Sequence, residues 1–167
     1  MSELVCGVDP SSTSSGISIL TTEEELIEFK AIPSPSKEYP DAFDRLRIQI
    51  EGISEVMNKY ELSYIFCEDQ YLQNNPKTLK MLSNVCGAVM GLALAKDARF
   101  QLFEPTKWRK FAMDNGSAKK EDTVAFMNEH YNLKLRKKDN DIADSIGVGL
   151  AGVKWGRENG IWKCSNK

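Results

Sequence analysis

The sequence holds little that would support cysteine or histidine chemistry. Its 167 residues include four cysteines and one histidine, His130. No two cysteines form a CxxC pair, and none stands at a zinc-ligand spacing from the histidine. This scarcity disfavours a zinc site and a disulfide framework, so we expect reduced, buried thiols and no catalytic role for His130.

Long apolar runs are scarce as well. The longest stretch, residues 85–95, falls short of the roughly 20 residues that a membrane-spanning helix needs. The opening residues, MSELVCGVD, lack the basic and then apolar pattern of an export signal. We therefore expect a cytoplasmic protein with no membrane association.

Basic charge is not in overall excess. The net charge of −2 argues against indiscriminate binding to nucleic acid. The charge is unevenly distributed, however: residues 21–70 carry 5 basic and 12 acidic residues, a net of −7, whereas residues 103–138 carry 9 and 5, a net of +4. This asymmetry predicts an electropositive region suited to DNA beside an acidic one.

The apolar pattern predicts one mixed α/β domain, residues 1–155, with a polar tail, residues 156–167, to which we assign no role. Three short apolar segments open the chain as an antiparallel meander, and two more alternate with helices. The expected strands are residues 4–9, 16–20, 25–31, 63–68 and 99–103. The expected helices are residues 42–60, 76–96, 105–113, 117–130 and 140–155.

The helix expected over residues 76–96 carries two apolar stripes. A helix that is apolar over so wide an arc is buried on more than one side. It either lies sandwiched inside a single domain or packs on its own sheet and on a second copy of the chain. Gly87 and Gly91 would permit close backbone approach in both cases.

Carboxylates stand at the ends of three separate segments. Asp9 and Glu68 each end an apolar strand, and Asp141 and Asp144 are three residues apart on one helical face. On its own, each has an ordinary explanation. Asp9 could cap a turn, Glu68 could merely follow the end of a strand, and the aspartate pair could belong to a solvated first helical turn, where the helix dipole stabilises negative charge. Cys67, one residue before Glu68, is expected to face the opposite, buried side of its strand, as is Cys6 relative to Asp9.

Together the carboxylates predict one metal site. Two carboxylates about 4 Å apart repel by roughly 4 kcal/mol at an effective dielectric near 20. Such a cluster persists best around Mg²⁺ or Mn²⁺, which take oxygen ligands. The sequence therefore indicates metal-assisted phosphoryl chemistry.

These segments resemble a known family. GVDPSSTSSGISIL, IFCEDQYLQ and DNDIADSIGVGLA are similar to the three acidic blocks of the RuvC family of Holliday junction resolvases, and GSAKKEDTV is similar to the stretch before that family's last helix. The resemblance covers nearly the whole chain in order. It implies a ribonuclease H-like α/β fold, with a five-stranded mixed sheet of three antiparallel strands followed by parallel strands, flanked by helices.

The resemblance also implies a set of site residues. Asp9, Glu68, Asp141 and Asp144 match the family's metal-binding acidic residues, which would hold Mg²⁺ or Mn²⁺, two ions per active site. Lys120 matches a catalytic basic residue near the scissile phosphate, and either Lys107 or Arg109 a second. Tyr71 matches an aromatic residue placed against bases near the strand crossover. The residues expected to contact DNA are Tyr71, Lys107, Arg109, Lys110, Lys119 and Lys120.

The implied activity is two-metal hydrolysis that needs no side-chain nucleophile and no nucleotide cofactor. A homodimer would nick opposing strands of a four-way DNA junction, and other branched DNA is a further expected partner. The alternatives without a functional role are that Lys120 is an exposed lysine at a helix start and that Tyr71 covers a loop. The basic run of residues 134–138 could bind phosphate or could be a solvated loop.

Two positions depart from the family pattern, and three other functions compete. Ser11 stands where the family usually has glycine and Ser145 where it usually has alanine, and the acidic composition resembles divergent phage-type members. The alternatives are another ribonuclease H-fold nuclease that cuts RNA/DNA hybrids or a different branched structure, an ATPase of the actin-like or sugar-kinase class, and a branched-DNA binder that does not cut. DPSSTSSG resembles the ATPase phosphate loop, but such enzymes need two domains, and the presence of all four acidic residues argues against lost chemistry.

Overall fold

The computed structural model describes residues 2–70 and 75–162. It contains five strands, five α-helices and one short 3₁₀ helix within that part of the chain. The strands are β1 (Leu4–Asp9), β2 (Ser14–Thr21), β3 (Leu26–Pro33), β4 (Tyr64–Glu68) and β5 (Arg99–Phe103). The helices are α1 (Ala42–Met57), α2 (Pro76–Ala95), α3 (Pro105–Met113), α4 (Lys120–Tyr131), η1 (Lys137–Asp139) and α5 (Asn140–Glu158).

The strands form one mixed sheet in the order β3-β2-β1-β4-β5. β1, β2 and β3 pair antiparallel, whereas β4 runs parallel to both β1 and β5. This confirms the expected sheet of three antiparallel strands followed by parallel ones. Because Val8 lies opposite Cys67 in the parallel pair, Asp9 and Glu68 leave neighbouring strands at the same edge.

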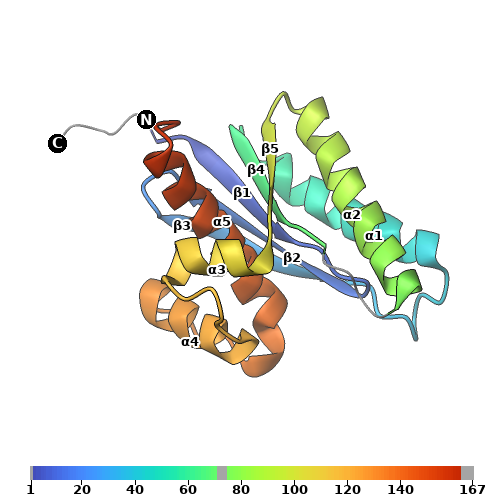
Figure 1. Ribbon diagram of the computed structural model, residues 1–167. Coiled ribbons are helices and arrows are strands. Elements are labelled where there is room, and N and C mark those ends of the chain that lie inside the picture. Colours follow the sequence, from blue (N-terminus) through green and yellow to red (C-terminus); the bar gives the residue numbers. More distant parts are fainter. Residues whose placement is uncertain (1, 71–74, 163–167) are drawn as a thin grey trace.

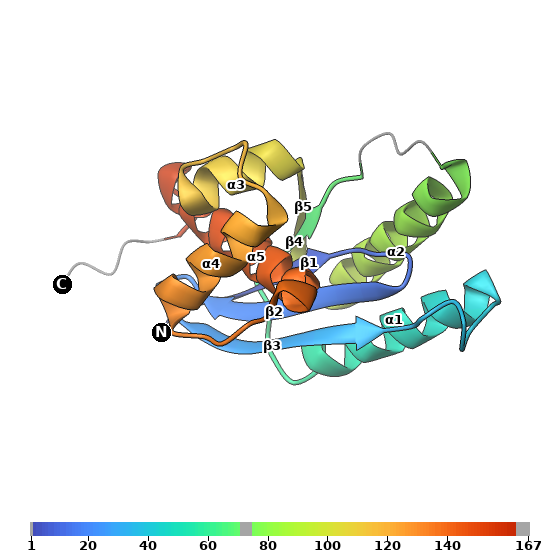
Figure 2. The same ribbon diagram turned by 90° about the horizontal axis from the view of Figure 1, so that it is seen from below.

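Helices cover both faces of the sheet, with α1 and α2 on one face and α3, α4 and α5 on the other (Figures 1 and 2). Each face has its own apolar core. Cys6 and Cys67 belong to the core under α1 and α2, and Phe66 belongs to the opposite one. The alternation of side chains along a strand therefore points Asp9 and Glu68 toward α5. The carboxylates thus face away from Cys6 and Cys67, as the sequence predicted.

The thiols match the expectation where they are described. Cys6, Cys67 and Cys86 are free and buried, and burial raises the pKa of the Cys6 thiol far above its ordinary value. The fourth cysteine, Cys164, lies outside the described residues.

Two glycines bring the start of α5 against the sheet. A Cβ atom added to Gly7 would lie 2.2 Å from the carbonyl oxygen of Ser145, and one added to Gly16 would lie 1.9 Å from that of Asp141. Neither distance leaves room for a side chain, so the backbones of β1, β2 and α5 meet directly. This close approach places the first turns of α5 beside the end of β1.

Several element boundaries differ from the sequence expectation. β2 begins at Ser14, two residues early, because Ser14 and Ser15 pair with the end of β3. α4 begins at Lys120, three residues late, because the side chain of Asp122 accepts the backbone N–H of Lys119 at 2.8 Å and fixes the start there. α1 ends three residues early, at Met57.

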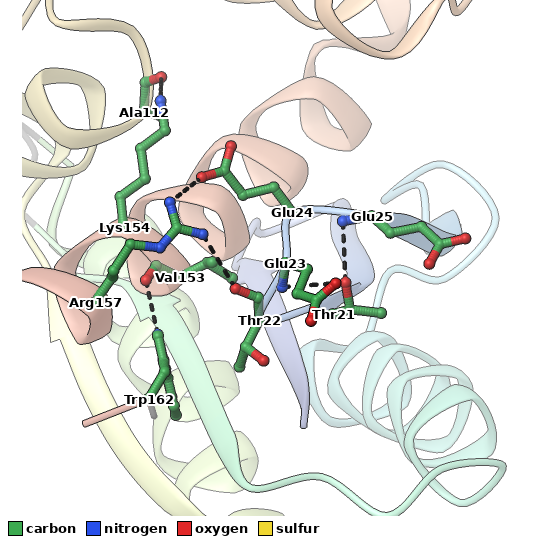
Figure 3. Close-up of polar contacts among 10 residues, drawn as sticks. All are labelled: Thr21, Thr22, Glu23, Glu24, Glu25, Ala112, Val153, Lys154, Arg157 and Trp162. Atoms are coloured by element: carbon green, nitrogen blue, oxygen red, sulfur yellow. Dashed lines mark hydrogen bonds and ion pairs between the residues drawn. The ribbon is translucent and has the colours of Figure 1, made fainter. Parts of the chain in front are cut away.

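The last helix is longer than expected and is held at its end. Arg157 pairs with Glu24 at 2.7 Å, and the indole N–H of Trp162 donates to the carbonyl oxygen of Val153 at 2.7 Å (Figure 3). Trp162 is buried. Ordered packing thus continues to Trp162, and the division into a domain, residues 1–155, and a tail stays a prediction.

α2 packs one face against the sheet. Met81, Val85 and Val89 are buried there, whereas Leu94 is exposed. Among the described residues, α2 is the one helix whose length and apolar composition would allow it to cross a membrane. The estimate from residues 85–95 of the sequence did not anticipate this. Its inner face packs against the sheet, and 33% of the apolar window is buried.

Candidate metal centre

Three carboxylates from distant segments converge at one edge of the sheet. Asp9 ends β1, Glu68 ends β4, and Asp144 stands in the second turn of α5. One oxygen of each lies within 4.8 Å of the other two. Parallel pairing brings the first two side by side, and the glycine contacts of α5 bring the third onto them.

Burial and mutual repulsion hold this cluster in an unfavourable electrostatic state. Asp9 is 6% exposed and Asp144 is 3% exposed. Burial first, and then repulsion from Glu68, raises the pKa of Asp9 well above its ordinary value and the pKa of Asp144 to about 7. Burial also raises the pKa of Glu68. Ionised together, these groups repel one another, and a cation would relieve that repulsion.

One oxygen of the cluster lacks a hydrogen-bond partner. Oδ1 of Asp144 is buried and has none among the described residues. Such atoms are rare in folded proteins, and a bound ion is one of their ordinary explanations. A hard divalent cation with oxygen ligands fits both this oxygen and the donor set around it.

Asp141 lies at the rim of the cluster. It is not one of the three converging carboxylates, but its charge raises the pKa of both Asp9 and Asp144, so it is close to them. Burial raises the pKa of Asp141 itself, and a hydrogen bond from the Ser14 side chain lowers it. The side-chain amide of Asn140 donates to Asp141 at 3.0 Å. That Asp141 binds the metal stays a prediction.

Trp108 is a site residue that the sequence analysis missed. Its indole Nε1 donates a 2.6 Å hydrogen bond to Oε2 of Glu68, and its ring is fully buried. A Cβ atom added to Gly147 would lie 2.4 Å from that ring, so this glycine makes room for it. The apolar face of α3, which also carries Phe111 and Ala112, predicts a buried tryptophan but not its polar partner.

Two of the predicted basic residues lie close to the carboxylates. Lys120, the first residue of α4, lowers the pKa of all four acidic residues. Arg109 lowers the pKa of Glu68 and Asp144, and its guanidinium lies 4.8 Å from the ring centroid of Trp108. Both positions suit a cation that would contact a phosphate bound at the carboxylates.

The other predicted DNA contacts have different surroundings. Lys107 lies over the ring of Phe103 at 5.7 Å. Lys110 pairs with Asp114 at 2.8 Å, with both side chains exposed. Lys119 stands immediately before α4, next to Lys120. Tyr71 lies outside the described residues. The roles of all four in DNA binding stay predictions.

The two departures from the family pattern are accommodated locally. The Ser11 hydroxyl accepts backbone N–H groups from Thr13 at 3.3 Å and Ser14 at 3.2 Å, which closes the loop after Asp9. The buried Ser145 hydroxyl donates to the carbonyl oxygen of Ile142 at 2.8 Å. Both serine hydroxyls therefore have hydrogen-bond partners within a few residues of the chain.

Comparison with known proteins relates the chain to one family. A model of the family "Crossover junction endodeoxyribonuclease RuvC" matches residues 5–152. A RuvC protein of Prosthecochloris aestuarii is 26% identical over 151 residues, which cover 88% of this chain and 79% of that protein. One from Aliarcobacter butzleri is 25% identical over 149 residues and covers 87% and 95% of the two chains.

A solved structure shares the fold. Thermus thermophilus RuvC in complex with a Holliday junction substrate superimposes with a TM-score of 0.78 at 17% identity, covering 93% of this chain and 96% of that one. At this identity the likeness concerns the fold, and it agrees with the sheet order and helix layers described above.

Proposed function

The chain belongs to the RuvC family of crossover junction endodeoxyribonucleases, and we propose that it resolves Holliday junctions at the carboxylate cluster by metal-dependent hydrolysis. It is an enzyme that acts on DNA phosphodiester bonds. The observation that carries the assignment of the site is the convergence of Asp9, Glu68 and Asp144, with a buried oxygen of Asp144 that has no hydrogen-bond partner among the described residues.

We propose Mg²⁺ or Mn²⁺, two ions per site, held by Asp9, Glu68, Asp144 and the neighbouring Asp141. Bound divalent cations supply activation of the attacking water and neutralisation of the leaving 3′ oxygen. The carboxylates themselves orient the site and must be ionised to bind. Because their pKa values are raised, protons compete with the cation for these oxygens.

Two cations of the chain are placed to act on the phosphate. Lys120 lies near all four acidic residues and would stabilise the charge that develops on the phosphate oxygens. Arg109, fixed against Trp108, would contact the same phosphate or its neighbour. We assign Lys107, Lys110 and Lys119 to the flanking DNA backbone, with Tyr71 at the branch.

We further propose a homodimer that forms through the outer face of α2. Leu94 is 77% exposed and Met90 39% exposed on this face. Gly87 and Gly91 have nothing of the described chain within 4 Å of an added Cβ, so a second backbone could approach closely. Two copies related by a twofold axis would present two centres for paired nicks. Because DNA is the substrate, we propose that the enzyme acts in the cytoplasm.

A substrate panel tests the function. Purified protein is incubated with four-way, three-way, linear duplex and RNA/DNA hybrid substrates, each with and without Mg²⁺. We expect paired nicks in the four-way junction that require the metal. Preferential cutting of the hybrid would instead identify a different ribonuclease H-fold nuclease, and metal-dependent binding without cutting would identify a branched-DNA binder.

A further inference from the structure

A buried amide lies on the far side of the sheet from the carboxylates. Gln49 belongs to α1 and is fully buried, next to the apolar residues Ile53 and Val56 of the same helix. An amide without partners is costly in such surroundings, so its hydrogen bonds determine what can be built around it.

Both ends of the Gln49 amide are bonded to buried serines. Its Nε2 donates to Oγ of Ser34 at 2.8 Å, and its Oε1 accepts a short hydrogen bond from Oγ of Ser15. Ser15 and Ser34 are themselves fully buried. Ser15 lies near the start of β2 and Ser34 directly follows β3, so the amide joins two strand ends.

The same serines hold the loop that follows Asp9. Oγ of Ser15 accepts the backbone N–H of Ser11 at 3.1 Å, and the backbone N–H of Ser34 donates to the carbonyl oxygen of Thr13 at 2.7 Å. Residues 10–13 are thus anchored at two points, and both anchors lead to Gln49. The Ser11 hydroxyl then closes the loop on itself through Thr13 and Ser14.

This loop touches the site on its other side. Asp9 immediately precedes the loop, and the side chain of Ser14 lies close enough to Asp141 to lower the pKa of that carboxyl. Gly16, two residues after Ser14, packs against the carbonyl group of Asp141. Gln49 is therefore linked through Ser15 to the residue 10–13 loop, and the strand that follows this loop lies directly against Asp141.

We propose that Gln49 is a positioning residue for the metal centre, and that Ser14 is the contact through which it acts on Asp141. Gln49 touches neither the metal nor DNA. It fixes the residue 10–13 loop, and the loop fixes the orientation of Asp141 and of the end of β1. Partners of this kind around metal ligands affect metal affinity almost as much as the ligands do. The inference rests on the proposed function of this site.

The test measures metal binding without DNA. Gln49→Met keeps the approximate volume and removes both hydrogen bonds, and Ser14→Ala removes only the contact to Asp141. Mn²⁺ binding is followed by the loss of the free-ion signal in electron paramagnetic resonance. We expect each variant to weaken Mn²⁺ binding by about 10-fold. The double variant should bind Mn²⁺ no more weakly than the more affected single variant, because both substitutions act through the same contacts.

A matched control separates positioning from packing. Ile53→Val removes a buried methylene from the next turn of α1 without touching the loop, so it should lower the melting temperature and leave Mn²⁺ affinity unchanged. If Gln49→Met lowers the melting temperature but binds Mn²⁺ like the unmodified protein, Gln49 only packs, and the inference is overturned. Should Gln49→Met not fold, Ser14→Ala decides: a similar loss of affinity supports the path, and unchanged affinity overturns it.

The outcomes also distinguish this inference from the function on which it rests. If the unmodified protein binds Mn²⁺ and cuts junctions while both variants match it, only the inference fails. If the unmodified protein binds no Mn²⁺ at all, the proposed metal centre fails and the inference falls with it.

Discussion

The indole Nε1 of Trp108 and the carboxylate of Glu68 are joined by a 2.6 Å hydrogen bond. The bond ties α3 to the end of β4, across 40 residues of sequence. It lowers the pKa of Glu68 against the effect of burial, so it favours the ionised form that a metal requires. Trp108 thus supports the ligand chemically as well as by packing.

Trp108→Phe is predicted to weaken metal binding. The change keeps an aromatic ring but removes the N–H donor, which should raise the pKa of Glu68 and lower Mg²⁺ affinity by about 10-fold. Calorimetric titration of the metal-free protein measures this. Trp162→Phe is the matched control, because it removes a 2.7 Å indole hydrogen bond to a backbone carbonyl far along α5. Equal metal affinities in the two variants would contradict the role assigned to Trp108.

Asp144 makes the stability of the metal-free protein depend on pH. Folding raises its pKa from 3.8 to about 7, so folding favours the protonated form. That contribution is complete below about pH 4 and is lost as the pH rises through about 7, with an upper limit of roughly 4 kcal/mol. We therefore expect the metal-free protein to lose melting temperature between pH 5 and pH 8, and Mg²⁺ to restore it at pH 8.

Asp144→Asn should remove most of this loss. The variant is predicted to melt several degrees above the metal-free unmodified protein at pH 8, since about 1 kcal/mol moves the melting temperature of a domain this size by about 2–4 °C. It should also no longer respond to Mg²⁺. The exposed Asp97, whose φ of 55° asparagine tolerates, supplies the control Asp97→Asn. A metal-free Asp144→Asn protein less stable than the unmodified one at pH 8 would refute this electrostatic account.

Lys120→Met should slow cleavage and shift its pH dependence. Lys120 lowers the pKa of all four acidic residues, so its removal raises them, and protons then compete with metal at higher pH. We expect kcat to fall by about 100-fold and the acidic limb of the pH–rate profile to move to higher pH. Lys59→Met controls for loss of a surface charge that pairs with Glu28 instead. An unshifted profile would place Lys120 away from the chemistry.

Leu94→Glu is predicted to prevent dimer formation. A charge on the exposed face of α2, near the end of the helix, would oppose burial of that face against a second copy. Sedimentation should then show a monomer, and four-way junctions should receive single nicks in place of paired ones. Phe43→Glu replaces another exposed hydrophobic residue, 68% exposed on α1, and should leave the assembly unchanged. A dimeric Leu94→Glu protein would exclude this interface.

The sequence predicts the parts of this molecule that depend on local pattern. The strands ending in Asp9 and Glu68 and the spacing of Asp141 and Asp144 follow from alternation and helical periodicity, and the parallel pairing then brings the strand ends together. The sequence pattern predicts too late a start for β2 because Ser14 and Ser15 look like loop residues, although they pair with the end of β3.

The sequence does not predict the long-range hydrogen bonds. Trp108 and Gln49 each lie on an apolar helix face, and periodicity indicates only that such residues are buried. The partner of Trp108 lies 40 residues away and the two partners of Gln49 lie 34 and 15 residues away, and the fold brings them together. The same holds for the basic residues. Only the packing of α3 and the position of the start of α4 show that Arg109 and Lys120 lie near the carboxylates, whereas Lys110 pairs with Asp114.

The most direct measurement of the central claim is cleavage of a four-way junction by Asp9→Asn, compared with Asp97→Asn and the unmodified protein across Mg²⁺ concentrations. Asp9 is the buried carboxylate that ends β1, and its replacement removes one ligand while keeping the side chain's size. We predict that cleavage is abolished while junction binding is retained, and that Asp97→Asn cuts normally. An Asp9→Asn protein that still cuts the junction would show that the metal centre has been assigned to the wrong residues.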